Sequence, residues 1–367
     1  MFSFFTKQKP AIGLDISDSS VRMMQLSPSA NGLFPNTYSQ VILPRGVVSD
    51  GEIKGAEKLA ESIKQAYNRP LSGHFDTTYA ILSVPESKSF VRVISVPRMS
   101  QEEAREAVPY EAEQYIPITN EQAYLDFRIL PDKANKDEDS DKMRVLITAT
   151  PHALIDQYVS SVKNAGLRPL AVEVESEAIA RCLVEESLLQ QPVLTIDISS
   201  SRTSIIIHDL GSLQFTSSLP VAGNTFTTRI SQCLTISMEE AEKYKIQAGL
   251  DPRKDQGKLR DCLAPQVQSL VEAISNAINF YKEHSEGSRQ VSRVFLTGGG
   301  SRIRGLDQFI SQLLSVGTDN KKISVSEGDP WINVLGKPVK RVPPIPKGDS
   351  ISFTTAIGLA LRGADIE

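Results

Sequence analysis

Several features are scarce or absent in this 367-residue sequence, and each absence excludes a class of protein. The three cysteines and four histidines stand far apart, so neither a zinc motif nor a disulfide framework is predicted, and we expect Cys182, Cys233 and Cys262 to be reduced thiols. The formal net charge of -4 gives no electrostatic basis for nucleic-acid binding. No apolar run approaches the roughly 18–20 residues of a membrane span. A cytoplasmic protein without a transmembrane segment is therefore predicted.

A short pattern that occurs twice dominates what is present. Residues 11–26 read AIGLDISDSSVRMMQL, and residues 192–210 read PVLTIDISSSRTSIIIHDL. In both, an apolar run reaches an aspartate, Asp15 or Asp197, and a turn of small polar residues leads into a second apolar run. The pattern predicts two β-hairpins. Asp and Ser are common in ordinary turns, but two copies half a chain apart favour a duplicated domain whose turns face one ligand.

A third motif lies in the C-terminal part of the chain. Residues 294–306, VFLTGGGSRIRGL, place three glycines between an apolar strand and a helix. Glycine lets a backbone approach a ligand closely, and the following helix offers free N–H groups. A lone triplet is explained more simply by a tight turn. Two hairpins, a glycine loop and a terminal helix of small residues, in that order, resemble the actin-like nucleotide-binding fold. The predicted class is α/β, an actin-like (ribonuclease H-like, duplicated) fold.

Longer matches resemble one family within that fold. They are EAEQYIPITNEQAYLDFRIL, AGLRPLAVEVESEAIAR, TGGGSRIRGLDQFI and AIGLALRG, and with the first hairpin they span about residues 12–363. Together they resemble the PilM family of type IV pilus assembly proteins, which is related to the division protein FtsA. The resemblance implies an FtsA-type inserted subdomain and four parts: 1–76 with 169–190 and 338–367 (subdomain 1A), 77–168 (the insertion, 1C), 191–236 with 290–337 (2A), and 237–289 (2B).

The resemblance also implies a nucleotide site, because actin-like proteins hold phosphates between two hairpin turns and adenosine against the glycine loop. The implied phosphate contacts are Ser17, Asp18, Ser19, Ser20, Arg22, Ser199, Ser200, Ser201, Arg202 and Thr203. The implied adenosine contacts are Gly223, Asn224, Glu242, Lys245, Gly298, Gly299, Gly300 and Arg302. Asp15 and Asp197 would hold Mg²⁺ through water, so the implied cofactor is ATP or ADP with Mg²⁺. Glu242 and Lys245 have an alternative interpretation as a surface ion pair on one helix.

Two departures from active actin-like ATPases bear on activity. Those proteins have glycine in both phosphate turns, where this chain has Ser17 and Ser199. Glycine permits positive φ and the closest backbone approach, whereas serine restricts both and adds a hydroxyl donor. Asp18 adds a negative charge that Arg22 or Mg²⁺ must offset. Because no general base is identified, nucleotide binding is predicted rather than brisk hydrolysis. A slow ATPase is the alternative, and a sugar kinase is disfavoured by the missing glycines.

The family resemblance further implies a protein partner. PilM-like proteins capture the short cytoplasmic N-terminal peptide of the inner-membrane protein PilN, in a groove between subdomains 1A and 1C. That contact would hold the chain at the inner face of the membrane, and other pilus platform proteins or the assembly ATPases are further implied partners. The alternative is a filament-forming protein like FtsA, which carries a C-terminal amphipathic anchor; the final residues here, ALRGADIE, do not resemble one. The predicted function is an ATP-binding scaffold of the pilus inner-membrane platform.

Three local features carry structural expectations. Ser100 with Glu103, and Ser237 with Glu240, form capping boxes that predict helix starts. Pro109 lacks a backbone N–H and is expected to kink or split the helix that follows Ser100. The acidic run DKANKDEDSDK at residues 132–142 is expected to be a mobile hairpin loop.

Overall fold

The computed structural model describes residues 10–30, 32–130, 141–250, 257–285, 289–317, 323–339 and 341–365. The chain divides into two compact units. Unit 1 comprises Met1–Pro85, Ala153–Glu185 and Asp329–Glu367, and unit 2 comprises Glu86–His152 and Glu186–Gly328. The acidic run expected to be a mobile loop lies almost entirely outside the described residues. The division into four subdomains stays a prediction.

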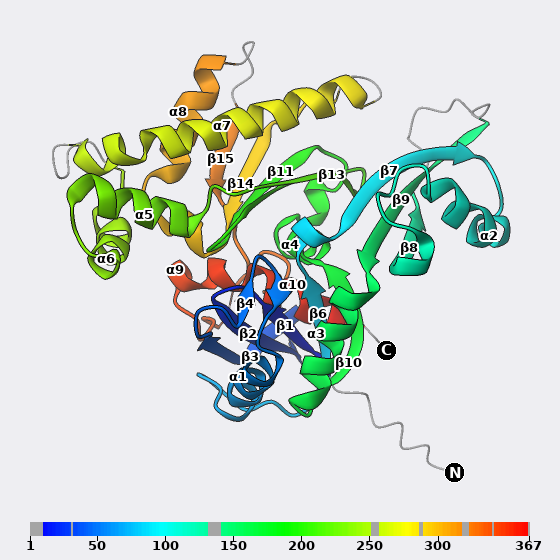
Figure 1. The fold of residues 1–367 in the computed structure, drawn as a ribbon, viewed down its shortest axis with the longest axis horizontal. Helices are drawn as coiled ribbons and strands as arrows, with labels where there is room; N and C mark the ends of the chain where they lie inside the picture. The colour runs from blue at the N-terminus through cyan, green and yellow to red at the C-terminus, as the bar shows by residue number, and fades with distance from the viewer. Residues whose placement is uncertain are drawn as a thin grey trace. The chain divides into compact units, whose positions relative to one another are not determined.

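Unit 1 is built on a five-stranded sheet (Figure 1). Its strands are β3 (Gly32–Ile42), β2 (Ser20–Ser29), β1 (Ile12–Ile16), β6 (Tyr79–Val84) and β10 (Arg168–Val174), in that spatial order. The first two pairings are antiparallel and the last two are parallel. The other elements of the unit are α1 (Ala56–Asn68), α3 (His152–Asn164), α4 (Glu175–Leu183), α9 (Lys347–Ser350), α10 (Thr354–Asp365) and the small hairpin of β4 (Val48–Ser49) and β5 (Glu52–Ile53).

Unit 2 contains a second five-stranded sheet with the same architecture. Its strands are β13 (Ser212–Leu219), β12 (Thr203–Asp209), β11 (Val193–Ile198), β14 (Arg293–Thr297) and β15 (Ser324–Glu327), in that order. Again the first two pairings are antiparallel and the last two parallel. Both hairpins therefore occupy the same place in their sheets, which confirms the predicted duplication. The helices of this part are α5 (Gly223–Leu234), α6 (Met238–Ala248), α7 (Lys258–His284) and α8 (Leu306–Gly317).

The described part of residues 86–152, which also belong to unit 2, contains a three-stranded antiparallel sheet and an α-helix. The strands β7 (Phe90–Pro97), β9 (Lys142–Pro151) and β8 (Ala123–Ile129) lie in that order, within the predicted insertion. Helix α2 (Gln101–Ala112) begins at the Ser100–Glu103 capping box as expected and continues through Pro109. The expected split does not occur, because a buried stripe that includes Val108 and Ala112 holds the last turn in the core of this sheet.

One cysteine prediction is wrong. Cys233 at the end of α5 and Cys262 in α7 form a disulfide, whereas Cys182 is free and buried. The pair meets because α5 and α7 pack together, where Arg229 Nε donates to the Cys262 carbonyl oxygen at 3.2 Å and the two cysteine Cα atoms lie 6.0 Å apart. That separation is typical of disulfides. A spacing of 29 residues in the sequence gives no sign of such packing.

None of the helices in the described ranges is both long enough and apolar enough to cross a membrane. The core of unit 2 instead includes a long apolar face of α7, which packs against the second five-stranded sheet through residues such as Leu270, Ile274 and Ile278.

A buried histidine in this core makes stability depend on pH. Burial, with a smaller contribution from the Arg128 charge, lowers the pKa of His208 to about 4, and its Nδ1 atom has no hydrogen-bond partner among the described residues. The His208 side chain is therefore protonated near pH 6.5 in the unfolded chain but only near pH 4 in the folded chain. Stability contributed by the neutral ring is present above pH 6.5 and is lost as the pH falls through that window.

We expect the free energy of unfolding to fall by roughly 2 kcal/mol between about pH 7.5 and about pH 5 on account of His208. Urea titrations at the two pH values measure this difference. The His208→Leu variant should lose that part of the pH dependence, while the exposed His74→Gln variant should keep the wild-type slope. Equal slopes for wild type and His208→Leu would contradict the assignment.

Candidate functional site

The two hairpin turns are closed in the same way, by Ser17 and Ser199. Ser17 N and Ser17 Oγ both donate to the Ser20 carbonyl oxygen, at 2.9 and 3.1 Å. Ser199 N and Ser199 Oγ both donate to the Arg202 carbonyl oxygen, at 3.0 and 2.9 Å. Each hydroxyl is thus used inside its own turn. The structure shows why serine is accepted there: it replaces the flexibility of glycine with a hydrogen bond that closes the turn.

Asp15 and Arg22 pair across the first hairpin. They are register partners on β1 and β2, and Arg22 Nη1 lies 3.5 Å from Asp15 Oδ2. Burial raises the pKa of Asp15, and the Arg22 charge and hydrogen bond partly counteract that rise. The Arg22 guanidinium also lies 5.8 Å from the centre of the Phe353 ring. Arg22 therefore compensates the buried Asp15 carboxyl group, although the sequence suggested a direct role on the phosphates.

Asp18 holds a neighbouring turn. Its two carboxylate oxygens accept hydrogen bonds from Asp50 N and Gly51 N, both at 2.9 Å, and these two residues have φ angles of 52° and 74°. Ser19 accepts from Leu43 N through its carbonyl oxygen at 2.9 Å. The negative charge of Asp18, which the sequence suggested would oppose a phosphate, is thus offset by backbone amides of the chain.

In unit 2 the second turn docks onto the start of α5. The carbonyl oxygens of Ser199 and Ser200 accept hydrogen bonds from Gly223 N and Asn224 N, at 2.9 and 2.8 Å. Arg202 Nε donates to Ser218 Oγ at 3.0 Å, and Thr203 Oγ1 donates to the Val221 carbonyl oxygen at 2.5 Å. These bonds fix the turn, the end of β13 and the first turn of α5 as one piece.

The glycine loop lies against the end of β11. Gly298 has a φ of +83°, and a Cβ atom there would lie 2.5 Å from Asp197 Oδ1. A Cβ atom at Gly300 would lie 2.5 Å from Ile198 Cγ2 and 3.1 Å from the Ser199 carbonyl oxygen. The absence of side chains at these two positions is thus required by packing of the loop on the second hairpin, before any ligand is considered. Gly299 and Arg302 belong to the short 3₁₀ turn that follows.

Lys245 joins α6 to the start of α5. The side chain is buried, and Nζ donates to Glu242 Oε2 at 2.7 Å, to Thr227 Oγ1 at 2.8 Å and to the Gly223 carbonyl oxygen at 3.2 Å. These are the three bonds that an ammonium group can donate. The alternative of a surface ion pair does not describe Lys245, because its charge is buried at 5 % exposure. Thr227, which the sequence analysis missed, faces this cluster from one helical turn beyond Gly223.

The structure therefore brings together the expected residues that belong to unit 2. Hydrogen bonds and packing join the turn at 199–203, Gly223 and Asn224, Glu242 and Lys245, and the glycine loop into one cluster in unit 2. Ser200 Oγ lies in this cluster, is buried, and has no hydrogen-bond partner in the described ranges. Asp15, Asp18, Ser17, Ser19, Ser20 and Arg22 form a separate group in unit 1. Within the described ranges, no three His, Cys, Asp or Glu side chains are grouped so as to hold a metal ion.

Comparison with known proteins places the chain in a family. Residues 13–364 match the family model described as "Type IV pilus assembly protein PilM". Among solved structures the chain is similar to the "PilM-PilN type IV pilus biogenesis complex", with 23% sequence identity, coverage of 97% of this chain and 99% of that one, and a TM-score of 0.81. It is also similar to MreB5 of Spiroplasma citri bound to AMPPNP, with 15% identity, coverage of 97% and 96%, and a TM-score of 0.51.

The chain also matches curated relatives. The cell division protein FtsA of Neisseria meningitidis serogroup B is 21% identical over 192 residues, which cover 47% of this chain and 46% of the relative. The chain spans about half the length of the first curated relatives it matches. These likenesses confirm the predicted actin-like fold and its relation to FtsA. Because the family model covers nearly all of the sequence, this chain belongs to the family of type IV pilus assembly proteins PilM.

Proposed function

We propose that this protein is a cytoplasmic scaffold of the type IV pilus inner-membrane platform that binds the N-terminal peptide of a PilN-like membrane protein. The observation that carries the proposal is the family match over residues 13–364. It is supported by the similarity of 97% of the chain to a structure solved as a PilM–PilN complex. Binding to a membrane-anchored peptide would place the protein at the inner face of the membrane.

A co-purification experiment tests the partner. The N-terminal cytoplasmic segment of the PilN-like protein from the same organism is fused to a carrier domain and co-expressed with the full chain. Retention of the chain on the fusion, and not on the carrier alone or on a carrier with the scrambled segment, is the expected result. Equal recovery on all three would contradict the proposal.

The second part of the proposal is that the cluster in unit 2 binds ATP or ADP. Its support is the convergence of the turn at 199–203, the first turn of α5 and the glycine loop, together with the buried Ser200 hydroxyl, which has no hydrogen-bond partner among the residues that the structure describes. A phosphate oxygen is an acceptor that such a hydroxyl can reach without rearrangement of the turn. The similar MreB5 structure was solved with AMPPNP, which is consistent with a nucleotide at this fold's site.

The proposal also covers the Mg²⁺ ion and the question of ATP hydrolysis. Asp15 and Asp197 are the carboxylates proposed for Mg²⁺, and the ion would need nucleotide phosphates and water to complete its octahedral shell. Arg22 already pairs with Asp15, so that carboxylate would reach Mg²⁺ through water. No residue of the described cluster is assigned as a general base, and the proposed role of the nucleotide is binding.

Substitutions of two neighbouring serines distinguish a contact with the nucleotide from a contact that only stabilises the turn. We expect Ser200→Ala to weaken binding of a fluorescent ADP analogue by roughly tenfold, because a hydroxyl donor to a charged phosphate is lost, with the melting temperature unchanged. Ser199→Ala is the matched control: it removes a turn-closing bond and should lower the free energy of unfolding by about 1 kcal/mol, with a smaller effect on nucleotide affinity. Fluorescence titration and thermal unfolding measure the two effects. An unchanged affinity of Ser200→Ala would contradict the proposed contact.

A further inference from the structure

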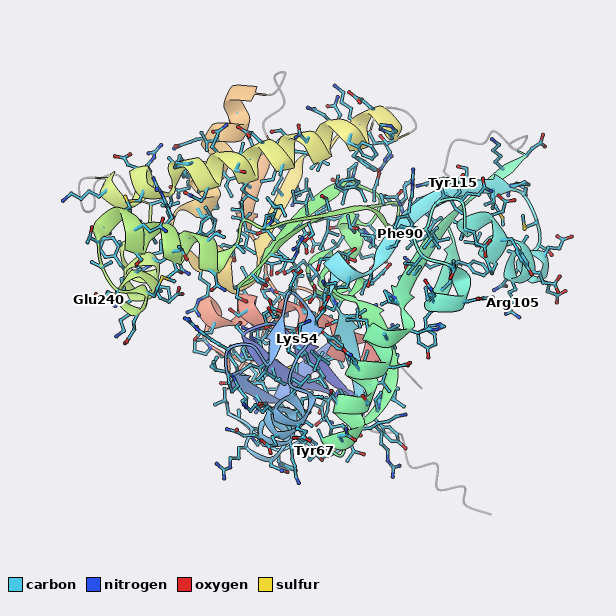
Figure 2. All side chains as sticks on the ribbon, in the orientation of Figure 1. Lys54, Tyr67, Phe90, Arg105, Tyr115 and Glu240 are labelled. Atoms are coloured by element: carbon cyan, nitrogen blue, oxygen red, sulfur yellow. A yellow bond between two sulfur atoms is a disulfide. The ribbon has the colours of Figure 1, made fainter. Side chains whose placement is uncertain are left out.

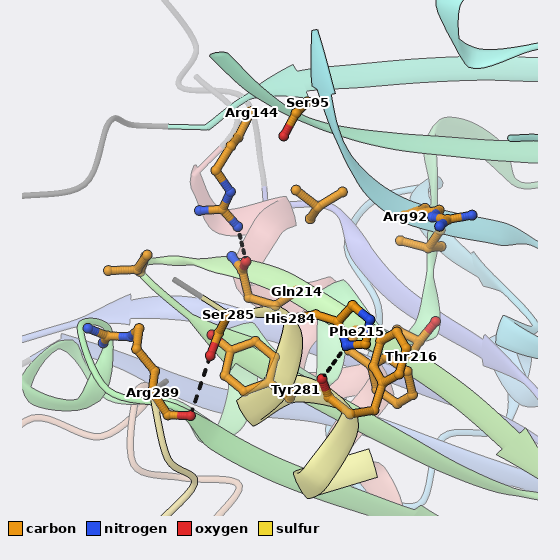
Figure 3. Close-up of a pocket in the computed structure, with 14 residues that line it drawn as sticks. Arg92, Ser95, Arg144, Gln214, Phe215, Thr216, Tyr281, His284, Ser285 and Arg289 are labelled. Carbon is orange, nitrogen blue, oxygen red and sulfur yellow. Dashed lines mark hydrogen bonds between the residues drawn. The ribbon is translucent and has the colours of Figure 1, made fainter. Parts of the chain in front are cut away.

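Unit 2 contains a pocket that the proposed nucleotide site does not use. It has a volume of about 380 Å³ and lies between strand β7, strand β13 and the C-terminal part of α7. Figure 3 shows the 14 lining residues, of which Arg92, Arg144, Arg289 and His284 are basic and none is acidic. Small-molecule sites in proteins commonly have volumes of about 300–1,000 Å³. The pocket is thus large enough for a small organic molecule.

Arg144 is the central cation of this pocket. Its Nη2 atom donates to Gln214 Oε1, whereas the buried Nη1 atom has no hydrogen-bond partner among the described residues. Gln214 is itself held, because its Nε2 atom donates to the Asp209 carbonyl oxygen at 2.9 Å. The guanidinium is therefore fixed in position with one donor unsatisfied. A buried charged donor without an acceptor is costly, and an incoming anion would satisfy it.

The buried Asp209 carboxylate pairs with Arg289, another basic residue that lines the pocket. Asp209 is fully buried, accepts from Tyr281 Oη and Arg289 Nη2 at 2.7 Å each, and also pairs with Arg289 Nε. Asp209 therefore neutralises Arg289 and leaves the charge of Arg144 uncompensated by it. The pocket consequently keeps a net positive character, and a ligand that carries a carboxylate or phosphate group is favoured there.

One wall of the pocket is aromatic. The rings of Phe215 and Phe280 lie 5.3 Å apart between their centres, and the Phe280 ring stacks on His284 at 4.1 Å. Phe280 is 47% exposed, which is unusual for a phenylalanine on a helix that otherwise buries its apolar side chains. A flat apolar group placed against this wall would remove that surface from water.

We propose that this pocket binds a small organic anion, with its carboxylate or phosphate group on Arg144 and a flat apolar body against Phe215 and Phe280. The unsatisfied guanidinium, the lack of acidic side chains among the described residues that line the pocket, and the exposed aromatic wall lie within one cavity and require the same ligand chemistry. The site is separate from the cluster formed by the second hairpin turn, the start of α5 and the glycine loop.

Calorimetric titration of the full-length protein tests the proposal with three probes of similar shape. They are 2-naphthoate, 2-naphthyl phosphate and the neutral 2-naphthalenemethanol. We expect saturable binding of at least one anion at one site per chain, no measurable binding of the alcohol, and a loss of affinity of about tenfold or more in Arg144→Gln. The preferred anion tells a carboxylate ligand from a phosphate ligand. Arg105→Gln, on the exposed face of α2 (Figure 2), is the control and should bind as wild type does.

A second variant keeps the test valid if Arg144→Gln is unstable. Ser95 lies directly opposite Arg144 in the β7–β9 pair and is exposed, so Ser95→Glu places a tethered carboxylate beside the guanidinium. It should abolish binding of the anions and raise the melting temperature, and that rise should vanish in the Arg144→Gln background. Ser95→Gln, which has the same size without the charge, should do neither.

The proposal is overturned by any of four results. They are an absence of heat with both anions, equal affinity for the neutral alcohol, unchanged anion affinity in Arg144→Gln, or anion binding by Ser95→Glu that matches Ser95→Gln.

Discussion

Replacing Asp209 by asparagine is expected to lower the free energy of unfolding by about 3 kcal/mol. The carboxylate is fully buried and accepts hydrogen bonds from Tyr281 Oη at 2.7 Å, from the Arg289 guanidinium and from Leu210 N at 2.8 Å. An asparagine amide would present an NH₂ group to donors and would leave the Arg289 charge without its partner. Chemical denaturation with fluorescence or circular dichroism detection measures the change.

Asp126→Asn is the matched control for that experiment. Asp126 is exposed on β8, and its Oδ1 atom accepts a hydrogen bond from Phe127 N at 2.9 Å. Its substitution should change stability by less than about 0.5 kcal/mol. If Asp209→Asn were as stable as Asp126→Asn, the network would not contribute to the fold as described.

The second large effect is expected at Gly358, where α10 crosses α4. A Cβ atom on Gly358 would lie 1.8 Å from the Ala178 carbonyl oxygen, so Gly358→Ala forces two buried helices apart. Gly13 on β1 is packed in the same way, because a Cβ atom there would lie 2.1 Å from the Ala356 carbonyl oxygen. We expect Gly358→Ala to cost about 3 kcal/mol or more, visible as a lower melting temperature and a lower yield of folded protein.

Gly348→Ala provides the comparison for this substitution. Nothing lies within 4 Å of the position that its Cβ atom would take, and its backbone does not require positive φ. It should melt within about 2 °C of wild type, since a change outside such features alters stability by about 0.5 kcal/mol at most. A Gly358→Ala protein that melted together with Gly348→Ala would show that the α10–α4 contact is looser than in this structure.

The sequence predicted the repeated part of the fold because its signal is local. Each hairpin is a pair of short apolar runs around one polar turn, so this local pattern located β1–β2 and β11–β12. The structure adds that the two five-stranded sheets share one strand order. The capping boxes that begin at Ser100 and Ser237 were also predicted from the sequence, because each is formed by two residues only three positions apart.

Features formed by distant residues could not be read in this way. Asp209 meets Tyr281 and Arg289 across 72 and 80 residues, and Cys233 meets Cys262 only because α5 packs on α7. The sequence around a single carboxylate at the end of a strand, or around one cysteine in a helix, does not indicate which distant residue it will contact. The prediction of three reduced thiols was wrong for this reason.

The candidate site shows the same limit at the level of single side chains. The sequence identified the two turns, the glycine loop and the Glu242–Lys245 pair, and the structure groups those of unit 2 in one cluster. The sequence could not reveal that Ser17 and Ser199 close their own turns. Nor could it reveal that Asp18 binds the amides of Asp50 and Gly51, or that Arg22 pairs with Asp15. Those roles depend on which hydrogen-bond partner is nearest, which only the folded chain decides.

The most direct test of the central claim is an isothermal titration of the full chain with the synthetic N-terminal cytoplasmic peptide of the PilN-like protein from the same organism. The account predicts saturable binding with one peptide per chain, and none with a scrambled peptide of the same composition. Repeating the titration with ATP or ADP present shows whether nucleotide alters the affinity. If the native peptide gave no heat and no saturable shift in a parallel fluorescence titration, or bound no better than the scrambled one, the assignment of this chain as a PilN-binding scaffold would be contradicted.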